Sequence, residues 1–202
     1  MAGRRRLNRE RVVARAVEMA DEAGDVTAVT LTALADALNV RTPSLYNHIE
    51  SLEDLRYGMA LAGVAELIAT LRKASMGLVG RPALLAIADA YRHFAQEHPG
   101  VYPLTVRAPE PDDEALQALA QELLQMLLLL MASIGVQGED AVHAIRGLRA
   151  ILHGFTSLEA AEGFKMALDR EQSFQRLVSA YLDGISPEPA REVRLNERPP
   201  FA

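Results

Sequence analysis

Apolar residues recur at the spacing of an α-helix along nearly the whole chain, and the alternation typical of a β-strand is not sustained anywhere. The first apolar stripe lies within residues 12–20. Asn8 before this stripe is a favourable N-cap, and Gly24 after it is typical of a helix end. Half of the 202 residues are hydrophobic, which is enough to bury a substantial core. We therefore expect an all-α fold.

Capping residues indicate where the next helices begin. Thr42 followed by Pro43 is typical of the start of a third helix, after a short second helix near residues 31–38. Ser51 is a favourable N-cap for a fourth helix, whose pattern continues over residues 52–74. The N-terminal part of the chain therefore predicts three short helices before a long one.

Beyond residue 75 the helical patterns become longer and more apolar. Glycines and a proline mark a break, after which we expect helices at residues 82–97, 112–134, 139–162 and 169–184. The run LLQMLLLLMASI, at residues 123–134, is apolar on every side of a helix. This run predicts a central buried helix.

Composition divides the chain into three parts. Residues 1–57 contain an N-terminal arm and the short helices, and residues 58–185 form a longer helical domain. Residues 186–202 hold prolines and charges with little to bury, so they predict a flexible tail. The formal net charge is −6, yet residues 1–15 contain six arginines and one glutamate. This basic end could lie along the phosphates of a nucleic acid.

Other classes of protein are disfavoured. The chain has no cysteine, so it can form no disulfide, thiolate metal site or cysteine nucleophile. There is no phosphate-binding loop, dinucleotide glycine pattern or nucleophile elbow, and His93 and His98 fall on different faces of a helix. We therefore expect no catalytic residues, no metal site and no cofactor. There is also no signal-peptide pattern and no long uncharged apolar run, so we expect a cytoplasmic protein without a membrane partner.

The segment LADALNVRTPSLYNHI, residues 34–49, has the pattern of a helix-turn-helix. Ala35 is a small residue where one helix faces its partner, and Asn39 tolerates the left-handed conformation that the turn requires. Leu45 is an apolar anchor in the second helix. The polar residues around Leu45 then point away from the protein, where DNA would lie.

Residues 8 to about 57 resemble the DNA-binding domain of the TetR family of bacterial regulators. The similarity runs through VTLTALADALNVRTPSLYNHIESLEDL and is most specific in SLYNH, residues 44–48. Two positions depart from the family pattern. Asn39 stands in place of the usual glycine at the turn, and Leu52 stands in place of a lysine that often contacts phosphate at the start of the fourth helix. Arg41 and the basic arm could supply that charge instead.

Leu45 and Ile49 are four residues apart and form the inward edge of the second helix, so the polar residues beside them face outward. The resemblance makes this outward side the DNA-contacting face. We expect phosphate contacts from Thr30, Thr32, Tyr46 and His48, and contacts nearer the bases from Arg41, Thr42, Ser44 and Asn47.

The second half carries a further resemblance. RGLRAILHGFTSLEAAEGF, residues 146–164, is similar to the C-terminal domain of TetR relatives named for a Trp-His-Gly motif, with Leu152 in place of the tryptophan. The resemblance implies a homodimer in which the last two helices form a four-helix bundle with a second subunit. The expected interface residues are Ala144, Gly147, Ala150, Gly154, Phe174, Leu177 and Tyr181. The small residues among them would equally suit packing within one chain.

The family resemblance also implies a cavity for a small apolar or aromatic effector. Its candidate lining residues are Phe94, His98, Tyr102, Met126, Leu127, Leu130, Met131, His153, Phe155 and Met166. Methionine and aromatic residues in helices more often belong to an ordinary core, which is the alternative for each of them. The long fourth helix is the only continuous element that runs from one domain into the other, so we expect it to transmit the effect of the ligand.

The sequence thus predicts a three-helix DNA-binding domain joined by a long helix to a helical ligand-binding and dimerisation domain. From the resemblance, we expect a repressor that leaves a near-palindromic double-stranded operator when a small-molecule effector binds. A TetR-like activator is the alternative within the family. A helical structural or interaction protein without DNA binding is the other class, but it would not need the outward polar face of residues 42–47.

Overall fold

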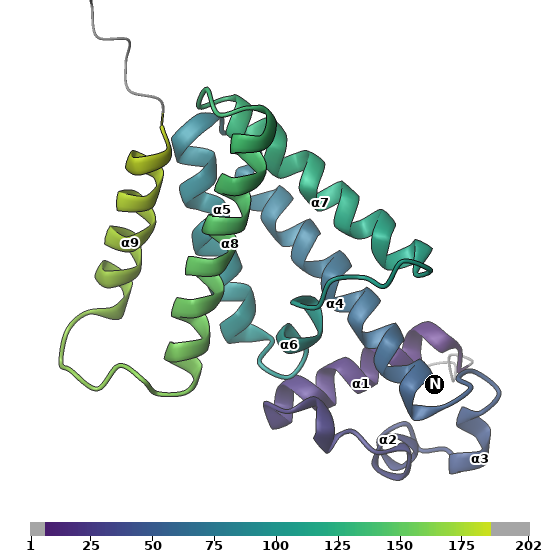
Figure 1. Ribbon diagram of the computed structural model, residues 1–202. Helices are drawn as coiled ribbons and strands as arrows, with labels where there is room; N and C mark the ends of the chain where they lie inside the picture. Colours follow the sequence, from purple (N-terminus) through teal and green to yellow (C-terminus); the bar gives the residue numbers. More distant parts are fainter. Residues whose placement is uncertain (1–6, 187–202) are drawn as a thin grey trace, which may run out of the picture.

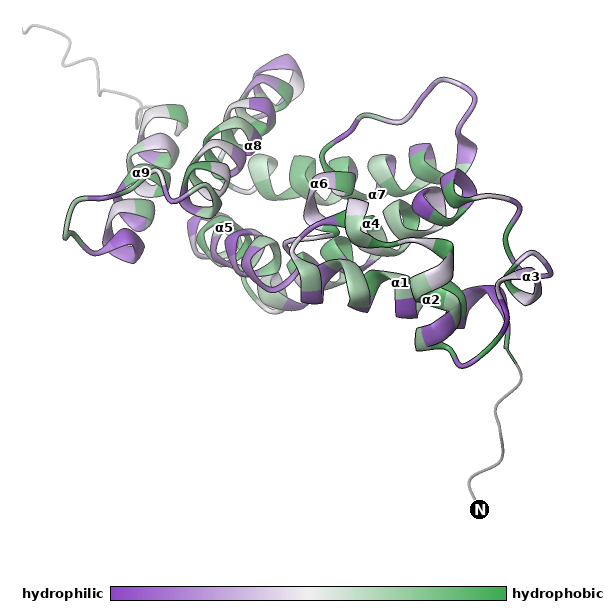
Figure 2. Ribbon diagram, turned by 90° about the horizontal axis from the view of Figure 1, so that it is seen from below, coloured by the Kyte–Doolittle hydropathy of each residue, from purple (hydrophilic) through white to green (hydrophobic). Residues whose placement is uncertain are grey.

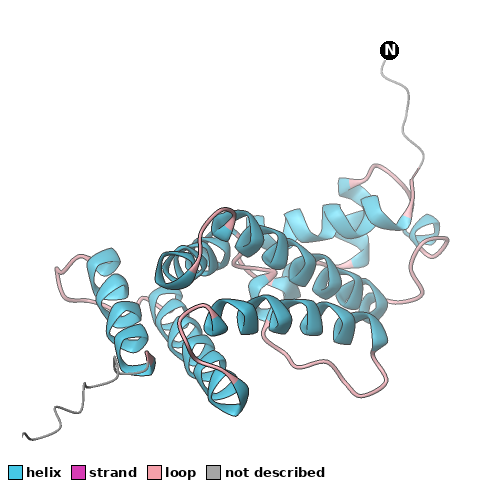
Figure 3. Cartoon of the chain, turned by 90° about the horizontal axis from the view of Figure 1, so that it is seen from above, coloured by secondary structure: helices cyan, strands magenta, loops and turns pink. Residues whose placement is uncertain are grey.

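The structure is a computed structural model that describes residues 7–186 (Figure 1). These residues form helices and no strand (Figure 3). The helices are α1 (Arg9–Ala23), the 3-10 turn η1 (Val26–Ala28), α2 (Leu31–Ala37), α3 (Thr42–Leu45), α4 (Leu52–Ser75), α5 (Gly80–Glu97), α6 (Tyr102–Thr105), α7 (Glu114–Ala132), α8 (Gly138–Ala160) and α9 (Arg170–Ile185). The predicted all-α fold is confirmed. The arginines at positions 4–6, which belong to the predicted basic arm, lie outside the described residues, and so do residues 187–202 of the predicted tail.

Local capping accounts for most of the predicted helix ends. The Asn8 and Ser51 side chains each accept a hydrogen bond at 3.0 Å from the backbone amide three residues later. Gly24 ends α1 in the left-handed conformation, with φ at 66°. The start of α3 was predicted one residue too late. Thr42 is its first helical residue and Arg41 is the N-cap, without a capping hydrogen bond from its side chain.

The N-terminal domain consists of α1 to α3 and the first half of α4, and α2 and α3 form its lower edge in Figure 1. Asn39, between α2 and α3, has φ of 54°, so it adopts the left-handed conformation predicted for the turn. The domain has a hydrophobic core of its own, which includes Val12, Ala16, Leu34, Leu45, Ile49, Leu55 and Met59. This core also contains Val101, which belongs to the turn before α6.

The second hydrophobic core is built around α5. This helix has eight buried residues, more than any other described helix, and it contacts α4, α7, α8 and α9. Phe94 of α5 and Phe174 of α9 are among the largest fully buried side chains. α9 lies at the outer side of α8, at the end of the molecule opposite α2 and α3 (Figure 1).

The prediction of a central buried helix at residues 123–134 is wrong. α7 is hydrophobic along most of its length (Figure 2), but Met131 is its only buried residue and Leu129 is 72% exposed. The reason is that α7 packs against three helices, α4, α5 and α8, whereas α5 also packs against α9 and buries far more of its residues. By length and composition alone, α7 is also apolar enough to cross a membrane.

Candidate nucleic-acid interface

The segment from Thr42 to Ile49 is held by two apolar side chains. Leu45 and Ile49 are both buried in the N-terminal core, as the sequence predicts for the inward edge of this segment. α3 itself is only four residues long, and turns continue it as far as residue 48. Because so short a helix is not stable alone, the buried pair fixes the position of the polar residues between them.

The eight predicted DNA contacts lie at the N-cap of α2, on α2 and α3, and in the loops that flank α3. Five of their side chains are exposed and three are half-buried; the exposed ones are Thr30, Thr32, Arg41, Tyr46 and Asn47, and the half-buried ones are Thr42, Ser44 and His48. Tyr46 is 55% exposed, an unusual state for an aromatic side chain in a small helical domain. Within residues 7–186, the side chains of Arg41, Tyr46 and Asn47 have no hydrogen-bond partner. Their donors and acceptors are therefore available to a ligand.

An ion pair fixes the end of this segment on α1 and α4. The Arg9 guanidinium donates to both carboxylate oxygens of Asp54, at 2.6 and 2.7 Å, and to the His48 carbonyl at 3.2 Å. The same carboxylate accepts a hydrogen bond from the Glu50 amide at 2.9 Å. The hydrogen bonds from Arg9 and from the Glu50 amide lower the pKa of Asp54 to about 2.

No local pattern predicts the pair formed by Arg9 and Asp54, since 45 positions separate the two residues. The pair also lies where TetR relatives often have a phosphate-contacting lysine, at the start of α4. Leu52 is half-buried at the first position of α4, and Arg9 of α1 pairs with Asp54 in the first turn of that helix. A basic group is therefore present there, although it comes from α1 and is paired.

The larger core contains a short chain of hydrogen-bonded polar groups among the predicted effector residues. The Tyr102 hydroxyl lies 3.0 Å from the Tyr91 hydroxyl and 2.6 Å from Nδ1 of His153. Burial, and then the hydrogen bond with Tyr91, raise the pKa of Tyr102 well above the usual range of a phenol. Such a chain supplies directed polar contacts inside an apolar environment.

The other predicted effector residues separate into those that join this core and those that do not. Phe94, Met131 and Phe155 are buried in it, and Met126, Leu127 and Leu130 pack against it. Two of the ten do not join this core. Met166 is 79% exposed in the loop after α8, and His98 bonds Asp21 of α1 at 2.7 Å at the edge of the domain. A surface depression of about 420 Å³ lies at the start of α8 and the end of α9, and none of the ten predicted residues lines it.

Part of the predicted dimer interface faces outward. Ala150 is exposed, Leu177 is 38% exposed, and a Cβ atom on Gly154 would meet no atom within 4 Å. Leu158, four residues after Gly154, is 53% exposed on the same side of α8. The sequence reading missed Leu158, although its spacing from Gly154 could have identified it. Together, Ala150, Gly154, Leu158 and Leu177 are referred to below as the α8–α9 outer face.

The remaining predicted interface residues serve packing within the chain. Phe174 and Ala144 are buried in the core of their own subunit, so their assignment to a partner contact is wrong. The Tyr181 hydroxyl donates to the Ala144 carbonyl at 2.7 Å. A Cβ atom on Gly147 would lie 2.1 Å from the same hydroxyl oxygen, so this glycine lets α9 approach α8. For Gly147 the intrachain alternative is the correct one.

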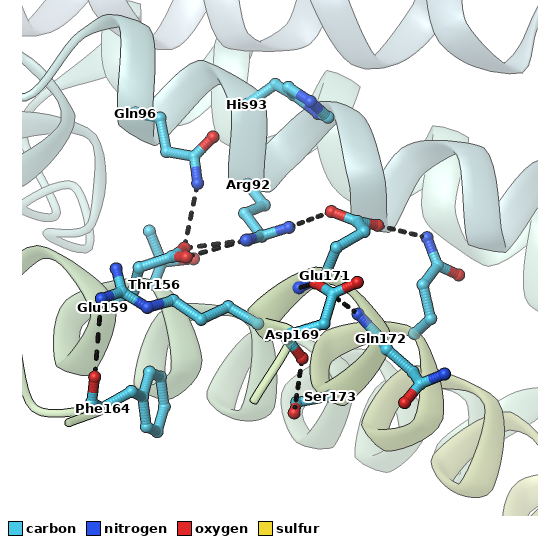
Figure 4. Close-up of polar contacts among 12 residues, drawn as sticks. Arg92, His93, Gln96, Thr156, Glu159, Phe164, Asp169, Glu171, Gln172 and Ser173 are labelled. Carbon is cyan, nitrogen blue, oxygen red and sulfur yellow. Dashed lines mark hydrogen bonds and ion pairs between the residues drawn. The ribbon is translucent and has the colours of Figure 1, made fainter. Parts of the chain in front are cut away.

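A buried ionic cluster ties α5 to the end of α8 and the start of α9 (Figure 4). Arg92 is 6% exposed and donates two hydrogen bonds of 2.8 Å to Glu159, and it also pairs with Glu171. Its guanidinium carbon lies 5.6 and 5.1 Å from the ring centroids of Phe155 and Phe174. Arg92 lowers the pKa of Glu159. This cluster, also absent from the sequence reading, fixes the two helices that carry the α8–α9 outer face.

Comparisons with known proteins agree with this architecture. The family described as "Tetracyclin repressor-like, C-terminal domain" matches residues 84–181. The uncharacterized HTH-type transcriptional regulator YobS of Bacillus subtilis is 35% identical over 186 residues, which span 92% of this chain and 96% of that protein. An uncharacterized HTH-type transcriptional regulator of Mycobacterium tuberculosis is 34% identical over 181 residues, or 89% of this chain and 82% of that protein.

Solved structures share the fold at lower identity. A protein of unknown function from Rhodococcus sp. RHA1 has a TM-score of 0.74 at 20% identity, covering 89% of this chain and 95% of its own. A TetR variant from Acinetobacter baumannii AYE, solved in complex with minocycline, has a TM-score of 0.65 at 22% identity, covering 89% and 96%. Given the exposed helix-turn-helix and relatives that match over nearly their whole length, the chain belongs to the TetR family of DNA-binding transcriptional regulators.

Proposed function

We propose that the chain is a homodimeric repressor that binds a near-palindromic operator through α2 and α3 and is released by a small apolar or aromatic effector. The observation that carries the DNA contact is the exposed polar face with Arg41, Tyr46 and Asn47, whose side chains have no partner among the described residues. Arg41 and Tyr46 suit phosphate contacts or the groove edge, and Asn47 has the paired donor and acceptor that reads a base edge.

The dimer is inferred from the α8–α9 outer face. Ala150, Gly154, Leu158 and Leu177 are small or apolar and lie exposed on two neighbouring helices. A second copy applied to this face would bury it and would form a four-helix bundle of α8 and α9 with their counterparts. The two recognition segments would then reach successive major grooves about 34–36 Å apart, which requires a twofold-symmetric operator.

The effector site is inferred in the core between α5, α6, α7 and α8. Phe94, Met131 and Phe155 supply apolar surface there, and the Tyr102 and His153 pair supplies the polar atoms that would orient a ligand. The Acinetobacter TetR variant was solved with minocycline, which supports an effector site in proteins of this fold. Displacement of helices around the ligand would reach the DNA-binding domain through α4, which runs between the two cores.

The experiment that tests the DNA-binding proposal is selection of bound duplexes from a random library by the full chain at moderate salt. A near-palindromic consensus whose half-sites are one helical turn apart supports the proposal, and the absence of any selected sequence contradicts it. Sedimentation at micromolar concentration tests the dimer separately, where a monomer would refute it. A reporter gene behind the selected site then distinguishes repression from activation. Function on DNA also implies a cytoplasmic location.

A further inference from the structure

The turn between α5 and α6 joins the two hydrophobic cores through adjacent residues. Val101 is buried in the N-terminal core, beside α1 and α4. Tyr102, the next residue, is buried in the larger core and hydrogen-bonds Tyr91 and His153. A Cβ atom on Gly63 of α4 would lie 2.4 Å from Cγ1 of Val101, so α4 lies in direct contact with this turn. A shift of Tyr102 therefore moves a residue of the other core.

Asp21, near the end of α1, binds the same turn through both carboxylate oxygens. One oxygen accepts hydrogen bonds from the amides of Gly100 at 3.1 Å and Val101 at 3.0 Å, and the other lies 2.7 Å from Nδ1 of His98. The Asp21 side chain is largely buried, at 14% exposure. Because one short side chain accepts all three hydrogen bonds, the turn has little freedom to slide along α1.

The backbone of the turn also touches α1 directly. A Cβ atom on Gly100 would lie 2.1 Å from the Ala20 carbonyl oxygen, so only glycine allows this approach. The sequence indicates α4 as the only connection between the two domains, but a single helix leaves the attached domain free to swing about it. The contact between Asp21 and residues 98–101 lies on α1, away from the axis of α4. A second attachment of this kind fixes the angle between the DNA-binding domain and the core domain.

We propose that Asp21 is a positioning residue that sets the orientation of the DNA-binding domain on the core and transmits movements of Tyr102 to α1. The transmission part rests on the proposed effector function, whereas the orientation part does not. Without the Asp21 carboxylate, α1 would lose its three hydrogen bonds to residues 98–101 and keep only packing contacts with this turn, so the recognition segments of a dimer would be held less firmly at one spacing.

The test measures domain orientation within one chain, without DNA or effector. Because the chain has no cysteine, Asp36→Cys on α2 and Gln121→Cys on α7, both exposed positions, provide the only two sites for spin labels. Labelled chain is mixed with an excess of unlabelled chain, so that intrachain distances dominate in pulsed electron paramagnetic resonance. Asp21→Ala should broaden the distance distribution between the labels while circular dichroism stays that of the folded parent.

A matched control is available next to Asp21. Glu22 is an exposed carboxylate whose one ion-pair partner among residues 7–186 is Arg15 of its own helix, so Glu22→Ala should leave the distribution unchanged. An Asp21→Ala distribution as narrow as that of the parent would overturn the proposal, and so would equal broadening by Glu22→Ala. If Asp21→Ala does not fold, His98→Ala removes one of the three hydrogen bonds and should also broaden the distribution. An unchanged distribution in His98→Ala would then refute the orienting role.

Transmission is tested by a double-variant cycle. Tyr102→Phe removes the hydroxyl that reaches Tyr91 and His153 but keeps the ring. It should shift the label distance in the parent and add no further shift in the Asp21→Ala background. Equal shifts in both backgrounds would overturn transmission through Asp21. On the duplex selected from a random library, Asp21→Ala should reduce affinity roughly 5- to 150-fold, the usual range for coupling between sites. If no duplex is selected, the distance measurements still decide the orienting role.

Discussion

Gly147 and Tyr181 are in direct contact within one chain, since a Cβ atom on Gly147 would lie 2.1 Å from the Tyr181 hydroxyl oxygen. That hydroxyl also donates a hydrogen bond to the Ala144 carbonyl, so α9 packs against α8 at the turn that contains Gly147. A Cβ atom on Gly154, two turns further along α8, would meet no atom within 4 Å. The two glycines therefore have different roles, one inside the subunit and one on its surface.

Leucine substitutions at these two glycines should have opposite signatures. Gly147→Leu forces the Tyr181 ring away and should lower the free energy of unfolding by about 1 to 3 kcal/mol, the usual cost of overpacking. Gly154→Leu meets open space and should leave thermal unfolding of the subunit intact while it disrupts the dimer. Thermal unfolding and sedimentation of both variants check this. A Gly154→Leu protein that remains dimeric would remove this glycine from the interface.

Adjacent residues of the recognition segment should separate DNA binding from stability. Tyr46→Ala removes an exposed side chain without a partner and should weaken binding to the selected duplex by about 1 to 3 kcal/mol, with unfolding unchanged. Leu45→Ala, at a fully buried position, should instead lower the free energy of unfolding by about 2 to 5 kcal/mol. Fluorescence anisotropy and urea unfolding measure the two effects. Full DNA affinity in Tyr46→Ala would place this tyrosine outside the interface.

The Arg9 and Asp54 pair should give stability that depends on pH in the acid range. The pKa of Asp54 is lowered to about 2 in the folded protein, below that of an unfolded aspartate, so its contribution is complete above the unfolded pKa. It should be lost as pH falls through about 4 toward 2. Asp54→Asn should therefore be less stable than the parent by on the order of 1 kcal/mol at pH 7, with a smaller difference at pH 3. Urea unfolding at both pH values tests this, and a constant difference would contradict it.

Arg92 and Glu171 should contribute different amounts to the free energy of unfolding. Arg92→Ala would leave Glu159, at 11% exposure, as an unpaired buried charge and should cost about 3 to 5 kcal/mol of unfolding free energy. Glu171 is 49% exposed, so Glu171→Ala should cost no more than about 1 kcal/mol. Guanidinium denaturation of the two variants measures both values. Equal losses in the two variants would mean that the pair with Glu171 accounts for the whole contribution of Arg92, which would contradict this prediction.

Arg41 provides a test of the electrostatic part of DNA binding. If its exposed guanidinium neutralises one phosphate, Arg41→Ala should reduce the slope of log affinity against log salt by about 1. Titrations of the selected duplex at four or five salt concentrations give this slope. Arg107→Ala, an exposed arginine in the loop before α7, is the matched control and should leave the slope unaltered.

Features determined by neighbouring residues were predictable from the sequence. The caps at Asn8 and Ser51 and the left-handed Asn39 depend on a few adjacent positions, and all three were predicted correctly. The inward edge formed by Leu45 and Ile49 follows from helical spacing alone. The residues assigned to DNA contact stay a prediction, since no nucleic acid is bound to test them.

Features that depend on which helices meet could not be predicted in this way. The apolar run in α7 suggested a central helix, but burial depends on the number of neighbours, and α5 has more of them. Arg92 meets Glu159 across 67 positions and Asp21 meets the Val101 amide across 80, and no local pattern joins residues so far apart. Met166 lies exposed in a loop, where no helical periodicity indicates which way a side chain faces.

The recognition segment owes its place mainly to the buried Leu45 and Ile49, whereas Arg41, Tyr46 and Asn47 beside them are exposed. Within these eight positions, one set of side chains therefore holds the segment in place and a different set would determine which DNA sequence it prefers. Substitutions at the exposed Tyr46 and Asn47 should cost the fold little, so a duplicated copy of this regulator could change its DNA preference while its core domain stays the same.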